Sequence, residues 1–203
     1  MKIFIISLAA CVCFSCTKLA LIYEGVKKPA LETPDRLTKF LIRQQIDTSE
    51  MLCFQDTLAL YRFYGQHIGI PEARFFNRQK QLVDYRDKPS DCNGHVAVFM
   101  EKMDSINYLS PDPVLILDNF TSSLAYAKDM RPFQLESKEY DLYLVMYWAK
   151  FMGKVNKHKV FEWETLAAKA KQQGLKIRVL KINVDFHQLW GITEDQMPDF
   201  EFR

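Results

Sequence analysis

The sequence lacks an excess of charge of either sign, and it lacks the short motifs that mark the commonest enzyme classes. Its 27 basic and 25 acidic residues leave a net charge of only +2, too weak a field to favour nucleic acid as a partner. It contains no Gly-x-Gly-x-x-Gly, no Gly-x-Ser-x-Gly and no phosphate-binding loop. Its four histidines show no His-x-x-x-His spacing, so no metal site and no cofactor is expected.

Long apolar runs are also scarce, and the one near the N-terminus is too short to span a bilayer. Lys2 is followed by an apolar run over residues 3–14, interrupted by Ser7. A membrane-spanning helix needs on the order of 20 apolar residues, whereas about a dozen after a basic residue is typical of a signal peptide. We therefore predict a signal peptide over residues 1–15; the alternative is an N-terminal helix or strand of the core.

Three cysteines close this window, and the sequence around them resembles a lipobox, in which a cysteine after small residues is lipidated and becomes the mature N-terminus. Cys16 follows Ser15 and leaves a signal of fifteen residues, so it is the preferred lipidation site. Cys11 follows a better residue pattern but leaves a signal of only ten residues, and it is the alternative. Cys13 follows the bulky Val12 and fits less well.

The lipobox resemblance implies a bacterial lipoprotein that is exported and held on an envelope membrane by acyl chains such as palmitate. Each acyl chain contributes about 0.8 kcal/mol per buried methylene, so two or three chains hold a protein essentially permanently. Thr17 stands where an acidic residue commonly marks retention in the inner membrane, which favours the outer membrane. Residues 16–34 carry Pro29, Pro34 and two lysines and are predicted to be a spacer.

The mature chain alternates predicted helices and strands, as expected of an α/β protein. A helix is expected after a cap at Thr33 or Asp35. Hydrophobic spacing then predicts a strand at 51–54, a helix at 58–64, a hairpin over 73–85 and a helix at 94–103. A break at 110–113 separates a predicted module 35–109 from a second module 110–203.

The second module carries the clearest signals for buried strands. A continuous apolar run at 142–148 and a predicted buried strand at 177–184 flank a helical apolar stripe at 160–170 that includes Trp163 and is expected to lie opposite Lys171. The apolar residues of the second strand are Ile177, Val179, Leu180, Ile182 and Val184. A strand, a helix and a strand in this order predict a parallel βαβ unit. Less marked patterns predict strands at 114–117 and 200–202 and a helix at 122–130.

The run from Tyr147 to Val155, YWAKFMGKV, resembles the active-site stretch of thioredoxin-like proteins, in which Trp-Ala-x-(aromatic) ends a central strand and Cys-x-x-Cys opens the helix. Pro71, with its hairpin and helix, resembles the ββα half of that fold, and Pro198 precedes the predicted last strand. Both prolines are candidates for the cis-proline of the family. The resemblance implies a thioredoxin-like α/β fold with central mixed sheets, as two packed modules, which we favour, or as one rearranged domain.

The chain departs from that family at the residues that perform its chemistry. Met152 and Val155 occupy the two cysteine positions, and neither side chain can ionise or form a disulfide. Dithiol oxidoreductase activity is therefore not expected. The basic cluster that follows can contact an anion or form a solvated face; it contains Lys154, Lys157, His158 and Lys159. These features favour a non-catalytic module that binds or scaffolds another envelope protein.

The remaining cysteines and histidines give weaker signals. Beyond the first sixteen residues only Cys53 and Cys92 remain, as a candidate disulfide or as two free thiols in an oxidising compartment. The alternative function is a thiol-dependent oxidoreductase or peroxidase that uses Cys53 or Cys92. Asp185 and His187 share one side of an extended segment, an arrangement that surface residues also show.

Overall fold

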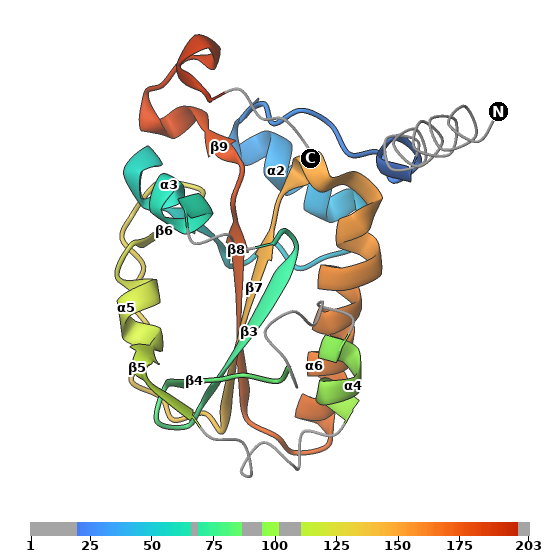
Figure 1. The fold of residues 1–203 in the computed structure, drawn as a ribbon, viewed down its shortest axis with the longest axis vertical. Coiled ribbons are helices and arrows are strands. Elements are labelled where there is room, and N and C mark those ends of the chain that lie inside the picture. Colours follow the sequence, from blue (N-terminus) through green and yellow to red (C-terminus); the bar gives the residue numbers. More distant parts are fainter. Residues whose placement is uncertain (1–19, 66–68, 87–94, 102–110, 199–203) are drawn as a thin grey trace, which may run out of the picture.

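A computed structural model describes residues 20–65, 69–86, 95–101 and 111–198 and shows a mixed seven-stranded sheet between two layers of helices (Figure 1). In sheet order the strands are β5 (Pro111–Ile116), β4 (Gln81–Val83), β3 (Glu72–Asn77), β7 (Leu142–Trp148), β8 (Ile177–Asn183), β2 (Met51–Phe54) and β6 (Leu124–Tyr126). The three strands β7, β8 and β2 are parallel, and every other neighbouring pair is antiparallel.

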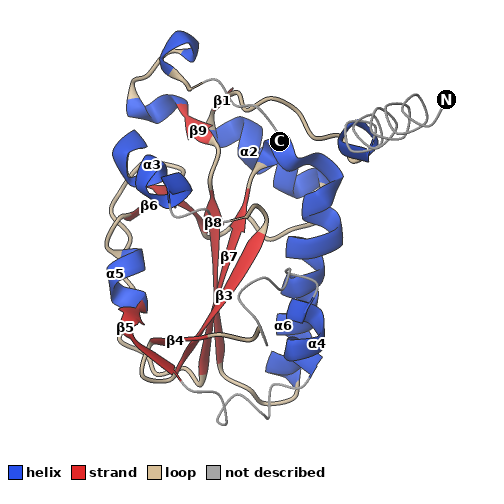
Figure 2. Cartoon of the chain, viewed as in Figure 1, coloured by secondary structure: helices blue, strands red, loops and turns tan. Residues whose placement is uncertain are grey.

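Helices cover both faces of this sheet (Figure 2). One face packs against α2 (Pro34–Arg43), α4 (His95–Glu101) and α6 (Glu162–Gln172), and the other against α3 (Thr57–Gly65) and α5 (Leu117–Thr121). Side chains of β7 alternate between the two cores, as the pleat requires: Trp148 lies in the α2 and α6 core and Tyr147 in the α3 and α5 core. Burial on both faces explains why β7 is apolar at every position.

The local signals for α2 and α6 are confirmed. The Arg36 backbone N–H donates to the Thr33 hydroxyl at 3.2 Å, so Thr33 is the N-cap of α2. In α6 the Trp163 side chain is 1% exposed, whereas Lys171 is exposed. The helix completes a parallel βαβ unit, because β7 and β8 pair in parallel from Leu142↔Ile177 to Trp148↔Asn183.

The prediction of a helix at 122–130 is wrong. Helix α5 ends at Thr121, and β6 then pairs antiparallel with β2. Leu124 and Ala125 are fully buried by this pairing, and Met130 has a positive φ of 57°, which ends any helical path. The predicted strand at 114–117 begins earlier and ends at Ile116, because Leu117 starts α5. The predicted strand at 200–202 lies outside the described residues.

Strands from both halves of the chain share the one sheet. Strand β3, from the first half, pairs with β7 at six positions, from Glu72↔Tyr147 to Asn77↔Leu142. Strand β2, also from the first half, pairs with β8. Above this sheet, β1 (Leu31–Glu32) and β9 (Phe186–His187) form a separate parallel pair. Among the described helices, none has the length and hydrophobicity that a bilayer crossing demands.

Candidate functional site

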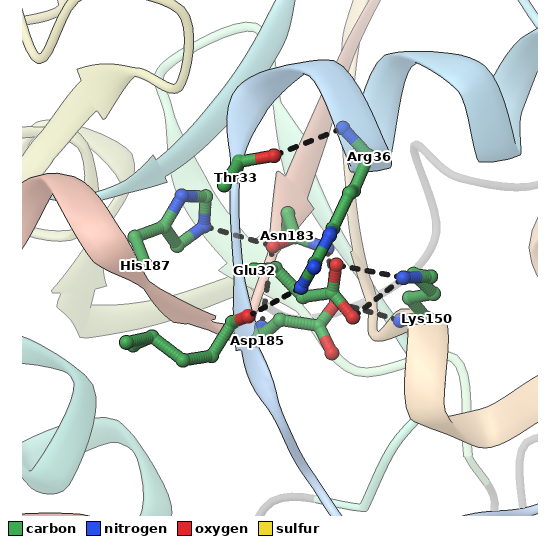
Figure 3. Close-up of polar contacts among 8 residues, drawn as sticks. Glu32, Thr33, Arg36, Lys150, Asn183, Asp185 and His187 are labelled. Atoms are coloured by element: carbon green, nitrogen blue, oxygen red, sulfur yellow. Dashed lines mark hydrogen bonds and ion pairs between the residues drawn. The ribbon is translucent and has the colours of Figure 1, made fainter. Parts of the chain in front are cut away.

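The carboxyl ends of β7 and β8 form the edge of the parallel sheet at which ligand sites of α/β proteins tend to lie. Strand β7 ends at Trp148 and leads into the 3-10 segment η2 (Lys150–Asn156). Strand β8 ends at Asn183, the residue paired with Trp148, and leads through Asp185 into β9. This edge therefore holds both the run from Tyr147 to Val155 that resembles a redox motif and a cluster of polar side chains, which Figure 3 shows.

Three polar side chains, at the last position of β8 and at the two alternate positions that follow, form a buried hydrogen-bonded cluster. His187 Nε2 lies 2.9 Å from Asn183 Oδ1, and Asn183 Nδ2 donates to Asp185 Oδ2 at 2.7 Å. The same Asp185 oxygen accepts the backbone N–H of Lys150 at 2.6 Å. Because the Asn183 amide directs its oxygen at the imidazole, Nε2 of His187 carries the proton. All three side chains are at most 1% exposed.

Burial shifts the two titratable groups of this chain in opposite directions. Desolvation raises the pKa of Asp185 to about 6; the amides of Lys150 and Phe151 and the Asn183 side chain oppose that rise, and the Glu32 carboxylate adds to it. Desolvation lowers the pKa of His187 to about 4. At neutral pH the site therefore holds a neutral imidazole and a buried carboxylate.

The N-terminal segment closes over this cluster. Glu32 is 5% exposed, and its two carboxylate oxygens lie 2.6 and 2.7 Å from Lys150 Nζ. Its strand β1 pairs with β9, and the Arg36 guanidinium donates to the Leu31 carbonyl, as Figure 3 shows. The β1–β9 pairing thus holds the start of the fold against its C-terminal strand, and the Glu32–Lys150 ion pair holds it against the segment that follows β7.

A second contact of the same segment depends on a glycine. The Lys154 N–H donates to the Glu24 carbonyl at 2.7 Å, and the Lys27 N–H donates to the Phe151 carbonyl at 2.8 Å. Gly153 has φ 53° and ψ −127°, and a Cβ there would lie 2.4 Å from the Gly25 carbonyl oxygen. Only glycine fits that approach. We call residues 24–32 the strap; they belong to the predicted spacer 16–34 but lie bound on the fold.

The structure places Met152 and Val155 in η2, where both are half-buried and Met152 packs against the α3 and α5 core. A regular α-helix does not open here, in contrast to the geometry that the family resemblance implies. Gly153 interrupts the segment, and the Asn156 amide donates to the carbonyls of Ala149 and Gly153 at 2.8 and 3.1 Å. A π-helical turn η3 (Lys157–Phe161) then precedes α6.

The two cis-proline candidates differ. The Ile70–Pro71 peptide bond is cis and lies one residue before Glu72, which pairs with Tyr147 next to the motif. The bond before Pro198 is not cis, since the described residues hold no second cis peptide bond. Before Pro198, a capping box between Thr193 and Gln196 stabilises a short 3-10 turn, and Met197 then has an extended backbone.

The cysteine that the structure describes, Cys53, pairs with Asn183 at this end of the sheet, but its side chain lies in the α2 and α6 core. Cys53 is a free thiol in β2, 0% exposed, with its Sγ 3.7 Å from Met130 Sδ. Burial raises the pKa of Cys53 to about 12. Cys16, the alternative site Cys11 and Cys92 lie outside the described residues, so lipidation and the Cys53–Cys92 disulfide stay predictions.

A pocket of about 340 Å³ lies elsewhere, between α3, α5 and the sheet. Its walls are mainly apolar, and the exposed Arg62 lies among its lining residues. The described residues hold no group of three His, Cys, Asp or Glu side chains that could bind a metal ion. None of the residues that line this pocket belongs to the strap or to the cluster of Asn183, Asp185 and His187.

The chain matches no protein-family model, no curated protein and no solved structure. Chemically, the cluster of Asn183, Asp185 and His187 contains an acid and an imidazole separated by an amide. Sequence reasoning paired Asp185 with His187 but did not include Asn183, Glu32 or Lys150. The alternation of Asn183, Asp185 and His187 is the one sequence signal that could have indicated this hydrogen-bonded cluster. Nothing in the sequence around Glu32 indicates that it lies next to the cluster.

Proposed function

We propose that this protein is an envelope lipoprotein with a non-catalytic thioredoxin-like fold that binds or scaffolds another envelope protein. One observation carries the proposal. The loop that stands at the redox-motif position has Met152 and Val155 in place of thiols, and its backbone already bonds to the strap through Lys154 and Phe151. A site built in this way holds a peptide backbone without acting on it.

The arrangement of the sheet supports the thioredoxin-like part of the proposal. The unit β7, α6 and β8 supplies the βαβ half, and Pro71, β3, β4 and α4 supply the ββα half. The two halves join through the antiparallel pairing of β3 with β7. In this reading the ββα half precedes the βαβ half along the chain, which corresponds to one rearranged domain and not to two packed modules.

The burial of Cys53 weighs against this residue as the reactive thiol in the alternative proposal, a thiol enzyme that uses Cys53 or Cys92. A thiol enzyme requires a thiolate that its substrate can reach. Cys53 is 0% exposed, and its pKa is raised to about 12, so at neutral pH it is a buried thiol. Cys92 is then the residue on which a thiol-dependent oxidoreductase or peroxidase would depend.

The non-catalytic part is tested with the purified natural chain in an insulin-reduction assay with dithiol as electron source. We expect no reduction above the rate with dithiol alone. Cys53→Ala and Cys92→Ala variants provide the control, because insulin reduction that disappears with either substitution would establish the thiol enzyme instead.

The binding part is tested in cells by photo-crosslinking. A photoreactive amino acid is placed at Lys154, on the motif loop, or at Lys171, on the exposed end of α6. We expect one discrete crosslinked envelope protein from position 154 and none from position 171. Equal crosslinking from both positions would contradict a specific binding surface on this loop.

A further inference from the structure

Two large apolar side chains next to the strap project into solvent. Residues 20–23 form a short helical turn, with the Glu24 N–H donating to the Ala20 carbonyl at 2.9 Å. On this turn Ile22 is 71% exposed and Tyr23 is 74% exposed, more than any other large hydrophobic side chain among the described residues. Side chains of this kind at a surface mark a site that contacts another apolar phase or a partner.

Basic side chains surround this apolar pair. Lys154 Nζ lies 4.7 Å from the centre of the Tyr23 ring. Lys157 is exposed one turn further along, and Lys27 is exposed on the strap. Figure 1 shows the N-terminal turn beside the top of the helical segment that continues into α6. Within residues 20–28 and 150–159 the one acid is Glu24, which is half-buried, so the exposed charge of these two segments is positive.

We call Ile22, Tyr23, Lys27, Lys154 and Lys157 the basic-aromatic face. Its place in the chain limits what it can meet. Cys16 precedes Ala20 by four residues, a separation that a fully extended chain spans with at most about 14 Å. The backbone from Glu24 to Lys27 is fixed on the fold by its bonds to Phe151 and Lys154.

We infer that the basic-aromatic face is a membrane-contact surface that lies on the anionic headgroups of the bilayer in which the lipid anchor inserts. The inference rests on the proposed lipidation of Cys16. Tyrosine is enriched at the membrane interface, where its ring is buried and its hydroxyl is hydrated. Lysines beside a membrane anchor are attracted to anionic lipid over a Debye length of about 8 Å at physiological salt. The basic cluster noted in the sequence thereby gains an anionic partner of defined chemistry.

The test uses the full chain, purified from detergent-solubilised membranes and reconstituted into vesicles. The photoreactive amino acid benzoylphenylalanine replaces Tyr23, or Val98 on α4 as the control. Val98 is 49% exposed, and Figure 1 shows α4 in the lower part of the view, away from the N-terminal turn. The vesicles contain a trace of fluorescent phosphatidylglycerol in phosphatidylcholine, with or without added unlabelled phosphatidylglycerol. The measured quantity is the fraction of protein that carries fluorescent lipid after illumination.

We expect several-fold more lipid-labelled protein from position 23 than from position 98 in anionic vesicles, and a loss of that excess at high salt. A Lys154→Glu, Lys157→Glu double variant should lower labelling at position 23 several-fold. A Lys169→Glu, Lys171→Glu variant, with the same charge change at the far end of α6, should leave it unchanged.

Equal labelling from positions 23 and 98, labelling insensitive to both charge variants, or a protein-protein crosslink in place of the lipid adduct would each overturn the membrane-contact surface. The mature N-terminus of the same preparation is measured by mass. A chain without acyl groups contradicts the proposed lipoprotein, whereas an acylated chain without lipid labelling at position 23 contradicts only the inferred face.

Discussion

Replacing Asp185 with asparagine should change how the free energy of unfolding depends on pH, because Asp185 and His187 have opposite linkage. The pKa of Asp185 is raised in the folded state, so its contribution to stability is full below pH 4 and is lost as pH rises through about 6. The pKa of His187 is lowered in the folded state, so its contribution is full above about 6.5 and is lost as pH falls towards 4. Over this range the two groups offset each other.

The sizes of the two contributions are similar. For Asp185 the pKa moves from 3.8 to about 6, which corresponds to about 3 kcal/mol of unfolding free energy. For His187 the pKa moves from 6.5 to about 4, which corresponds to about 3 kcal/mol in the opposite direction. Removing one group therefore leaves the contribution of the other uncompensated.

The assay is urea denaturation followed by circular dichroism at several pH values between 4 and 7. Relative to the natural chain, Asp185→Asn should lose about 3 kcal/mol of unfolding free energy between pH 7 and pH 4. His187→Gln, whose side-chain amide can still donate to Asn183, should gain a similar amount over the same range. The double variant should show the slope of the natural chain again.

Comparing slopes separates this effect from the general cost of substitution. Each variant can be less stable at every pH without affecting the argument, because only the difference between pH 4 and pH 7 reports on titration. If the free energy of unfolding depended on pH in the same way for the natural chain and the two single variants, Asp185 and His187 would not titrate as described, and the reasoning would be refuted.

Three further outcomes are expected. Trp163→Ala should lower the free energy of unfolding by about 3 to 5 kcal/mol because the side chain is fully buried, whereas Lys171→Ala should change it by about 0.5 kcal/mol or less; equal denaturation midpoints would contradict the packing of α6. Gly153→Ala should release the strap and speed trypsin cleavage after Lys27, whereas Gly191→Ala, which has φ 72° but open space around it, should not; equal cleavage rates would contradict the contact. Cys16→Ala should yield a chain that mass analysis shows to be unlipidated. A natural chain whose mature N-terminus is another cysteine would contradict Cys16 as the lipidation site.

The central part of the fold is predictable from the sequence because its signals are local. The apolar run at 142–148 and the frequent apolar residues at 177–184 indicate two buried strands, and the stripe that includes Trp163 indicates the helix between them. Strand β6 is not predictable in this way. It is three residues long, and its strand character depends on pairing with β2, which lies about 70 residues earlier in the chain.

The strap shows why the candidate site is predictable only in part. Residues 24–32 contain Pro29 and exposed lysines and read as a spacer, yet their contacts to Phe151 and Lys154 are made by backbone atoms, which leave no side-chain pattern. The one trace of these contacts in the sequence is Gly153, and a glycine at this position is also compatible with an ordinary connection between a strand and a helix. The Glu32–Lys150 pair joins positions 118 residues apart, and no periodicity indicates such a pair.

In the proposed lipoprotein, the strap determines what happens when the domain is pulled away from the membrane. Force applied through the N-terminus reaches the strap first, where it loads the two backbone bonds at Phe151 and Lys154 and then the Glu32–Lys150 pair. The strands of the seven-stranded sheet carry load only after these contacts have separated, because α2 lies between the strap and β2 along the chain. The strap therefore detaches from the fold before the core unfolds. The segment between the lipid anchor and the domain then lengthens under tension while the sheet stays folded.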